Sequence, residues 1–114
     1  FKKYEDYFHL PKATEKSDPC WFAYLLTVKK GSPFTRQQFV DFLEENKIQT
    51  RSYFSGNILA HPGYNHLADE YGDIQKEFPI ATYSTINLGT YAGINDEKMA
   101  YIGEIVDKFF EEIS

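Results

Sequence analysis

The stretch from Thr50 to Asn57 combines the residue types best suited to binding a polar ligand. It reads Thr-Arg-Ser-Tyr-Phe-Ser-Gly-Asn and follows a short β-forming run. Arg51 can hold an anionic group, an aromatic ring such as Phe54 can stack on a ring, and the Asn57 amide can bind hydroxyls. The competing interpretation is a structural turn, with Arg51 in a surface ion pair and Phe54 in the core. Composition and spacing leave both interpretations open.

The other reactive side chains form no comparable pattern. His61 and His66 lie on either side of a Pro-Gly turn, at a spacing that suits metal ligands on no regular element. The single cysteine, Cys20, excludes an internal disulfide and a cysteine-only zinc or iron–sulfur site within the chain. Its apolar neighbours predict a buried, inert thiol. No glycine run matches a phosphate-binding loop. We therefore expect no metal site and no catalytic residue here.

Composition limits the class of protein. The chain has 114 residues, a length typical of one domain, with 12 Lys and Arg against 17 Asp and Glu. The net charge of −5 argues against a sequence-independent grip on nucleic acid. No apolar run approaches the roughly 18 residues of a membrane helix, and no signal-peptide pattern opens the chain. Because the first residue is Phe1 rather than Met, we expect a piece of a longer protein.

The first half of the chain predicts a lead-in, a strand and a helix. Residues 1–18 are charged and look irregular, so we expect a lead-in or linker before a domain at 19–114. Residues 20–28 are apolar on both faces, as in a central strand. A helix over 35–46 is predicted by a capping box of Thr35 with Gln38, a hydrophobic staple of Phe34 with Phe39, and a left-handed stop at Asn46.

The second half predicts two more strands and a long final helix. Strands are expected over 48–54 and 86–91, with weak helix over 65–76 and a short helix from Pro79 to about Ser84. The last helix is capped by Asn95 and should bury one face. That face would comprise Ile102, Val106, Phe109 and Ile113. The order predicts an α+β fold, a small antiparallel or mixed three-stranded sheet with helices packed on one face.

Several motifs, in this order and spacing, resemble one enzyme family. Together they are similar to the C-terminal small domain of the DegT/DnrJ/EryC1/StrS enzymes, which depend on pyridoxal phosphate and have the aspartate aminotransferase fold. The similarity extends over roughly residues 18–112 and is greatest to the branch of 3-dehydratases that act on CDP- or GDP-linked 4-keto-6-deoxyhexoses. Ala92 departs from the proline that the family commonly has there. The motifs are Pro19-Cys20-Trp21-Phe22, Thr50 to Asn57, His61-Pro62-Gly63-Tyr64 and Leu88 to Gly93.

The resemblance implies a division of labour within a longer enzyme. The cofactor, pyridoxal or pyridoxamine 5′-phosphate, and the catalytic lysine, or the histidine that replaces it in the dehydratases, would lie in a large N-terminal domain. The segment at 1–18 would be the linker from that domain. The small domain would close over the sugar nucleotide with Arg51, Phe54 and Asn57, and with His61 and Tyr64 as weaker candidates.

The resemblance also implies partners and a setting. The enzyme would be a cytoplasmic homodimer that removes the C3 hydroxyl of its sugar in the biosynthesis of deoxysugars for lipopolysaccharide O-antigen. Some members of the branch carry an iron–sulfur cluster and need a reductase partner. Cys20 alone cannot hold such a cluster, so its ligands would lie upstream.

Two alternatives stay open at this point. The chain could be the small domain of a nucleotide-sugar aminotransferase, which an upstream lysine in place of histidine would indicate. It could also be a non-catalytic interaction domain of the same fold. In each enzyme reading we expect the isolated segment to be inactive and to expose an apolar face that normally packs on the large domain.

Overall fold

The computed structural model describes residues 1–67, 69–72 and 84–113. Residues 69–72 are helical as well, within the stretch expected to be weakly helical. The helix expected from Pro79 to Ser84 lies almost wholly outside the described residues. The named elements in chain order are η1 (Lys2–Tyr4), β1 (Phe8–His9), β2 (Ala23–Val28), α1 (Arg36–Glu45), β3 (Thr50–Ser52), η2 (Ile58–Ala60), η3 (Pro62–Leu67), β4 (Thr85–Gly89) and α4 (Asp96–Glu112).

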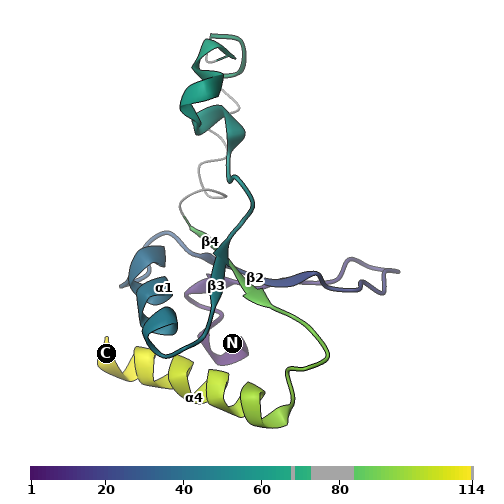
Figure 1. Ribbon diagram of the computed structural model, residues 1–114, viewed down its shortest axis with the longest axis vertical. Coiled ribbons are helices and arrows are strands. Elements are labelled where there is room, and N and C mark those ends of the chain that lie inside the picture. The colour runs from purple at the N-terminus through teal and green to yellow at the C-terminus, as the bar shows by residue number, and fades with distance from the viewer. Residues whose placement is uncertain (68, 73–83, 114) are drawn as a thin grey trace.

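The strands form one antiparallel sheet in the order β1-β2-β4-β3. Leu26 lies opposite Ile86, so these two side chains share a face of the sheet. Both are fully buried and belong to the cluster that α1 and α4 complete (Figure 1). The expected α+β fold with helices on one face is confirmed. The sheet has four strands rather than the expected three, and the additional strand is β1.

The first residues of the chain belong to the core, although an irregular lead-in was expected over 1–18. Phe8 in β1 is 1% exposed and packs its ring on Phe34 and Phe39 at 5.5 and 5.2 Å between centroids. Tyr4 in η1 stacks on Phe110 of α4 at 3.8 Å. β1 escapes a search for alternation because a strand of two residues has no period to detect.

Helix α1 begins as predicted and ends one residue differently. The Thr35 hydroxyl accepts from the Gln38 amide at 3.2 Å, and the Gln38 side chain accepts from the Thr35 amide at 2.8 Å. Phe34 and Phe39 meet across this cap, which confirms the staple. Asn46 is the C-cap but has a φ of −91°, and the left-handed residue is Lys47 at 61°. Asn46 instead donates its side-chain amide to the Phe42 carbonyl.

Helix α4 buries a wider stripe than expected. Asn95 caps it by accepting from the Lys98 amide at 3.0 Å, as predicted. Its buried residues are Ile105, Val106, Phe109 and Phe110. Of the predicted set, Ile102 and Ile113 are only partly buried. The stripe broadens because α4 is covered from two sides, by the sheet with α1 and by η1, whose Tyr4 lies on Phe110.

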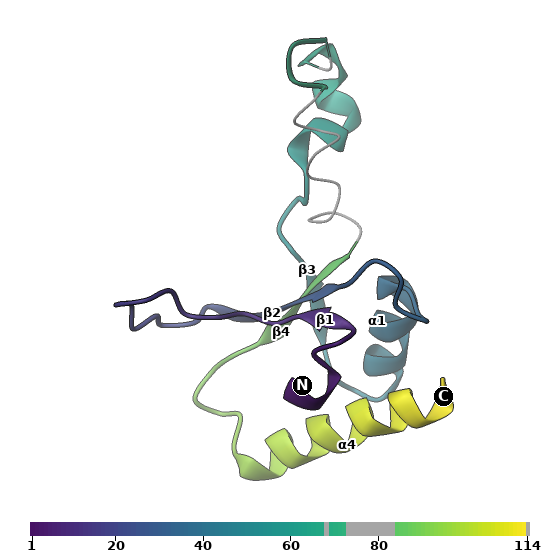
Figure 2. The same ribbon diagram turned by 180° about the vertical axis from the view of Figure 1, so that it is seen from behind.

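Two arms project from this core (Figures 1 and 2). One is the chain from Tyr53 to Gly72, which leaves the end of β3 and runs away from the sheet. The other is the connection between β1 and β2, over residues 10–22. The radius of gyration is 16.0 Å, whereas a compact chain of about 100 residues has roughly 13 Å. The strand expected over 48–54 is shorter, because the chain turns into the first arm after Ser52.

Candidate functional site

Arg51 lies in the middle of β3, where the end of α1 holds the strand in place. The Glu44 carboxylate accepts hydrogen bonds from the Thr50 amide at 2.5 Å and from the Thr50 hydroxyl at 2.7 Å. The bond from the Thr50 amide has the largest effect in lowering the pKa of Glu44 from its usual 4.5. The bond from the Thr50 hydroxyl and the nearby charge of Arg51 lower it further. The Arg51 side chain is exposed and lies opposite Asn87 of β4. A guanidinium so placed can bind an anion from solvent.

Phe54 lies at the base of the first arm in a conformation that bulky residues rarely adopt. Its φ is 45°, in the left-handed region. The turn around it is closed by the Gly56 amide, which donates to the Tyr53 carbonyl at 2.8 Å. The ring is 74% exposed, so the competing interpretation, a structural turn with Phe54 in the core, is wrong in this respect.

Phe54 has an aromatic neighbour from a distant part of the chain. Phe22, just before β2, lies with its ring nearly parallel to that of Phe54, at 11° and 6.3 Å between centroids. Phe22 is 81% exposed, and Trp21 and Tyr53 beside the pair are 45% and 37% exposed. Sequence reasoning missed Phe22 as a site residue. Its only signal was an aromatic pair, Trp21-Phe22, inside a family motif.

Asn57 and His61 shape the loop that follows Phe54. The side-chain oxygen Oδ1 of Asn57 accepts a hydrogen bond from the Leu59 amide at 3.0 Å and caps η2. The His61 Nε2 lies 2.6 Å from the Ser55 carbonyl, and since a carbonyl only accepts, this nitrogen carries the proton. Both predicted site residues thus have roles in building the arm. Tyr64, farther along in η3, is 41% exposed and lies near the His66 ring.

Cys20 is exposed, so the expectation of a buried thiol is wrong. The reason is that β2 begins only at Ala23, and the apolar run before it belongs to the second arm. The Trp21 carbonyl accepts a hydrogen bond from the Thr90 hydroxyl at 3.0 Å, which ties this end of the arm to β4.

A buried polar atom lies beside Arg51 on the sheet face away from the helices. Asn87 is 9% exposed and donates its amide nitrogen to the Ser52 carbonyl at 3.3 Å. Its side-chain oxygen has no hydrogen-bond partner within the part of the chain that the structure describes. An unpaired buried acceptor costs about 1–3 kcal/mol, so this oxygen is suited to a donor from a bound molecule or from a covering protein surface.

The sequence profile described as the DegT/DnrJ/EryC1/StrS aminotransferase family matches residues 1–107. This chain belongs to that family. The match includes the residues of η1 and β1, in agreement with their place in the core.

Similar proteins include sugar dehydratases. The chain is 37% identical over 105 residues to dTDP-4-dehydro-2,6-dideoxy-D-glucose 3-dehydratase of Saccharopolyspora spinosa, covering 92% of this chain and 23% of that protein. It is 35% identical to lipopolysaccharide biosynthesis protein RfbH of Salmonella typhimurium, over 92% of this chain and 24% of that protein. It is 24% identical to GDP-4-keto-6-deoxy-D-mannose 3-dehydratase of Escherichia coli O55:H7, over 97% of this chain and 25% of that protein. The chain thus spans about a quarter of these relatives.

A solved structure has the same fold. It is a crystal structure of GDP-4-keto-6-deoxymannose-3-dehydratase with a trapped PLP-glutamate geminal diamine. The TM-score is 0.59 at 19% identity, and the alignment covers 91% of this chain and 27% of that one. At this identity the likeness concerns the fold, which agrees with the expected small domain of the aspartate aminotransferase fold.

Within residues 1–67, 69–72 and 84–113, no group of three or more His, Cys, Asp or Glu side chains is arranged to hold a metal ion. In the same residues, no helix has the length and apolarity to cross a bilayer.

Proposed function

We propose that this chain is the C-terminal small domain of a nucleotide-sugar 3-dehydratase dependent on pyridoxal or pyridoxamine 5′-phosphate. One observation carries the proposal. The relative that is 37% identical over 92% of the chain is named as a 3-dehydratase of a 4-keto sugar nucleotide. Since the chain spans about a quarter of that protein, the activity is proposed for the whole enzyme to which the chain belongs.

The described residues do not fit a site for the cofactor itself. None of their lysines is buried, and none of their glycines builds a phosphate-binding loop. The cofactor, which would act as an electron sink for loss of the C3 hydroxyl, is therefore assigned to the rest of the enzyme. This chain is assigned the binding and enclosure of the sugar nucleotide.

The base of the first arm supplies groups for that task. Arg51 is an exposed guanidinium, suited to the diphosphate or to sugar hydroxyls. Phe54, three residues later in the chain, is an exposed ring that lies near the ring of Phe22. Asn57 and His61, whose hydrogen bonds hold the loop in shape, are the next candidates, and Tyr64 is a more distant hydroxyl on the same arm.

The proposed substrate is a 4-keto-6-deoxyhexose linked to a nucleoside diphosphate. The sequence suggested CDP or GDP as the carrier. The names of the relatives point to GDP and add dTDP. The name of RfbH places one relative in lipopolysaccharide biosynthesis, in line with the proposed role in making deoxysugars for O-antigen.

The proposal extends to the assembly of the enzyme. We propose that the whole enzyme is a cytoplasmic homodimer whose main contacts lie in the large domain. Any iron–sulfur cluster, with the reductase partner that serves it, is assigned to residues outside this chain, because Cys20 cannot supply four ligands. If the whole enzyme binds iron, Cys20→Ala should leave its iron content unchanged, which tests that assignment.

A second candidate is the small domain of a nucleotide-sugar aminotransferase. The observation in its favour is the description of the matching family, which names aminotransferases. In this case the sugar would gain an amino group at C4 and keep its C3 hydroxyl.

The test uses the whole enzyme loaded with pyridoxamine phosphate. It is given CDP-, GDP- and dTDP-linked 4-keto-6-deoxyhexoses in turn, with and without glutamate. The proposal expects one of these sugars to lose its C3 hydroxyl without gaining nitrogen. Turnover that depends on glutamate and leaves an amino sugar would support the second candidate, and inert sugars would contradict both.

A further inference from the structure

The most exposed large apolar side chains of the described residues form a pair. Phe22 and Phe54 are 81% and 74% exposed. Their rings are nearly parallel, at 11°, and their centroids are 6.3 Å apart. Phenylalanines elsewhere in the domain, such as Phe8 and Phe39, are fully buried, so the pair differs from the ordinary use of this residue type in the fold.

The backbone near both rings is fixed by hydrogen bonds. The carbonyl just before Phe22, that of Trp21, accepts a hydrogen bond from the hydroxyl of Thr90, the residue that follows β4. The turn at Phe54 is closed by the bond from Gly56 to Tyr53 at 2.8 Å. His61 holds the next carbonyl, that of Ser55, at 2.6 Å. Exposed side chains on an ordered backbone lose less conformational entropy on binding than those on a free loop.

Phe54 also adopts backbone geometry that costs energy. A φ of 45° places a bulky residue in the left-handed region, at a cost on the order of 1–3 kcal/mol. Such strain concentrates in sites where a side chain must be aimed in one direction. In this case the conformation turns the ring toward Phe22, away from the core.

We propose that Phe22 and Phe54 form the stacking site for the nucleobase of the substrate. The inference rests on the proposed function, since it names the part of the sugar nucleotide that this surface takes. Parallel aromatic faces bind planar bases by stacking, and this interaction is nearly independent of base identity because every base has a π-face. Arg51, exposed on β3 just before the arm, is the cation for the attached diphosphate.

One observation favours a nucleobase over a protein surface as the occupant, since exposed aromatic rings with a nearby arginine occur in both kinds of site. The relatives are named for substrates on dTDP and on GDP. A platform that ignores hydrogen-bonding edges can take the base of either carrier, and a pair of phenylalanines is such a platform.

The first test needs no variant. The whole enzyme is titrated with CDP, GDP and dTDP, and the proton resonances of the bases are followed by NMR. Stacking on these rings predicts upfield ring-current shifts for all three bases. Unshifted base protons in a nucleotide that binds would overturn the inference.

The second test uses Phe22→Leu and Phe54→Leu in the whole enzyme, with Phe54→Trp as the variant that restores a ring and Tyr91→Leu as a control at another exposed aromatic. Each leucine variant should weaken binding of all three nucleotides about tenfold, raise KM and leave kcat, cofactor content and dimerisation unchanged. Phe54→Trp should restore binding. Loss of cofactor or of the dimer in the leucine variants, without shifted base protons in the wild type, would assign the rings to a protein interface and overturn the inference.

Nucleotide binding and dehydration are measured separately, so the two proposals can fail separately. Ring-dependent nucleotide binding by an enzyme that dehydrates no sugar would retain the stacking site and refute the dehydratase. Dehydration with nucleotide binding that neither leucine variant alters would retain the dehydratase and refute the stacking site.

Discussion

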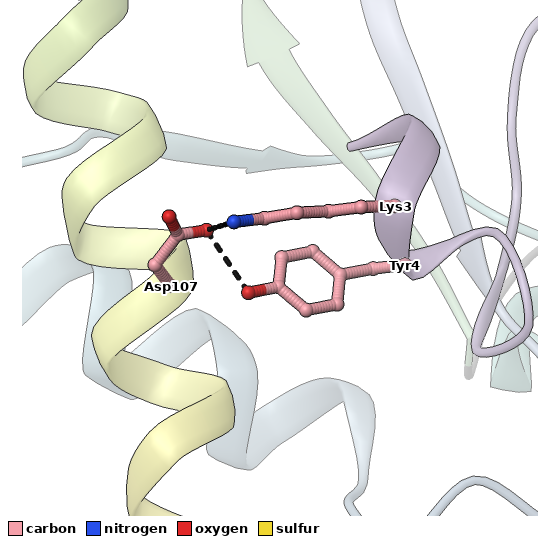
Figure 3. A network of polar contacts seen from close by, with 3 residues as sticks. All are labelled: Lys3, Tyr4 and Asp107. Atoms are coloured by element: carbon pink, nitrogen blue, oxygen red, sulfur yellow. Dashed lines mark hydrogen bonds and ion pairs between the residues drawn. The ribbon is translucent and has the colours of Figure 1, made fainter.

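The Tyr4 hydroxyl donates to the Asp107 carboxylate at 2.9 Å and so joins two residues 103 positions apart (Figure 3). Lys3 reaches the same carboxylate oxygen at 2.6 Å. The first residues of the chain are thereby fastened to α4, and the ring of Tyr4 adds a stack on Phe110. This attachment makes the N-terminal segment part of the folding unit.

The attachment predicts a pH-dependent contribution to stability. Bonds from Lys3, and more weakly from Tyr4, lower the pKa of Asp107 below its usual 3.8. A lowered pKa means that the ionised carboxyl stabilises the fold above pH 3.8, and that this contribution is lost as the pH falls through the folded-state value. Asp107→Asn should therefore destabilise the chain slightly at neutral pH, since the pair is exposed to solvent, and the difference should vanish in acid.

Urea unfolding at a series of pH values checks this expectation. Glu111→Gln, which removes a charge from an exposed position of the same helix, is the control and should show little effect at any pH. A difference between wild type and Asp107→Asn that grows in acid would contradict the proposed role of the carboxylate.

Phe8→Ala should cost about 3–5 kcal/mol of unfolding free energy, because the side chain is fully buried and a cavity would remain. Phe22→Ala offers a matched control, since that ring is 81% exposed, and should cost less than about 0.5 kcal/mol. Urea denaturation of both variants measures the two values. Equal costs would mean that β1 does not belong to the core.

Thr35→Ala should cost about 1 kcal/mol, because the start of α1 would lose the side-chain acceptor for the Gln38 amide. Thr35→Ser keeps the hydroxyl and should stay near wild type. The free energy of unfolding measures both. A loss of similar size in the serine variant would assign the effect to packing of the threonine methyl.

Arg51→Ala in the whole enzyme should raise KM for the nucleotide sugar about 10- to 100-fold, as expected for loss of hydrogen bonds to a charged group. Arg51→Lys should recover only part of this, because lysine keeps the charge and lacks the planar fork. Lys108→Ala, at an exposed cation on α4, is the control. Wild-type kinetics in Arg51→Ala would remove this residue from the site.

Features that depend on a few neighbouring residues were predictable. The cap of Thr35 with Gln38, the staple of Phe34 with Phe39 and the Asn95 cap each need only a short motif, and all three are present. The left-handed position after α1 was misplaced by one residue. Asn46 and Lys47 are neighbours there, and the preference of asparagine for the left-handed conformation favoured Asn46, whereas Lys47 adopts it.

Features that depend on contacts between distant segments were not predictable. β1 consists of two residues that form a strand only because β2 is beside them. Cys20 was expected inside because an apolar run cannot reveal that the strand begins only at Ala23. Phe54 was identified as a candidate, yet its partner Phe22 comes from the other arm, and no local pattern links the two.

The most direct test of the central claim is the mass of the sugar product formed by the whole enzyme. It would be incubated with pyridoxamine phosphate and a nucleotide-linked 4-keto-6-deoxyhexose, without any amino donor. The account predicts a product that has lost the C3 oxygen as water and has gained no nitrogen. A product that keeps its C3 hydroxyl and carries a new amino group at C4 would contradict it.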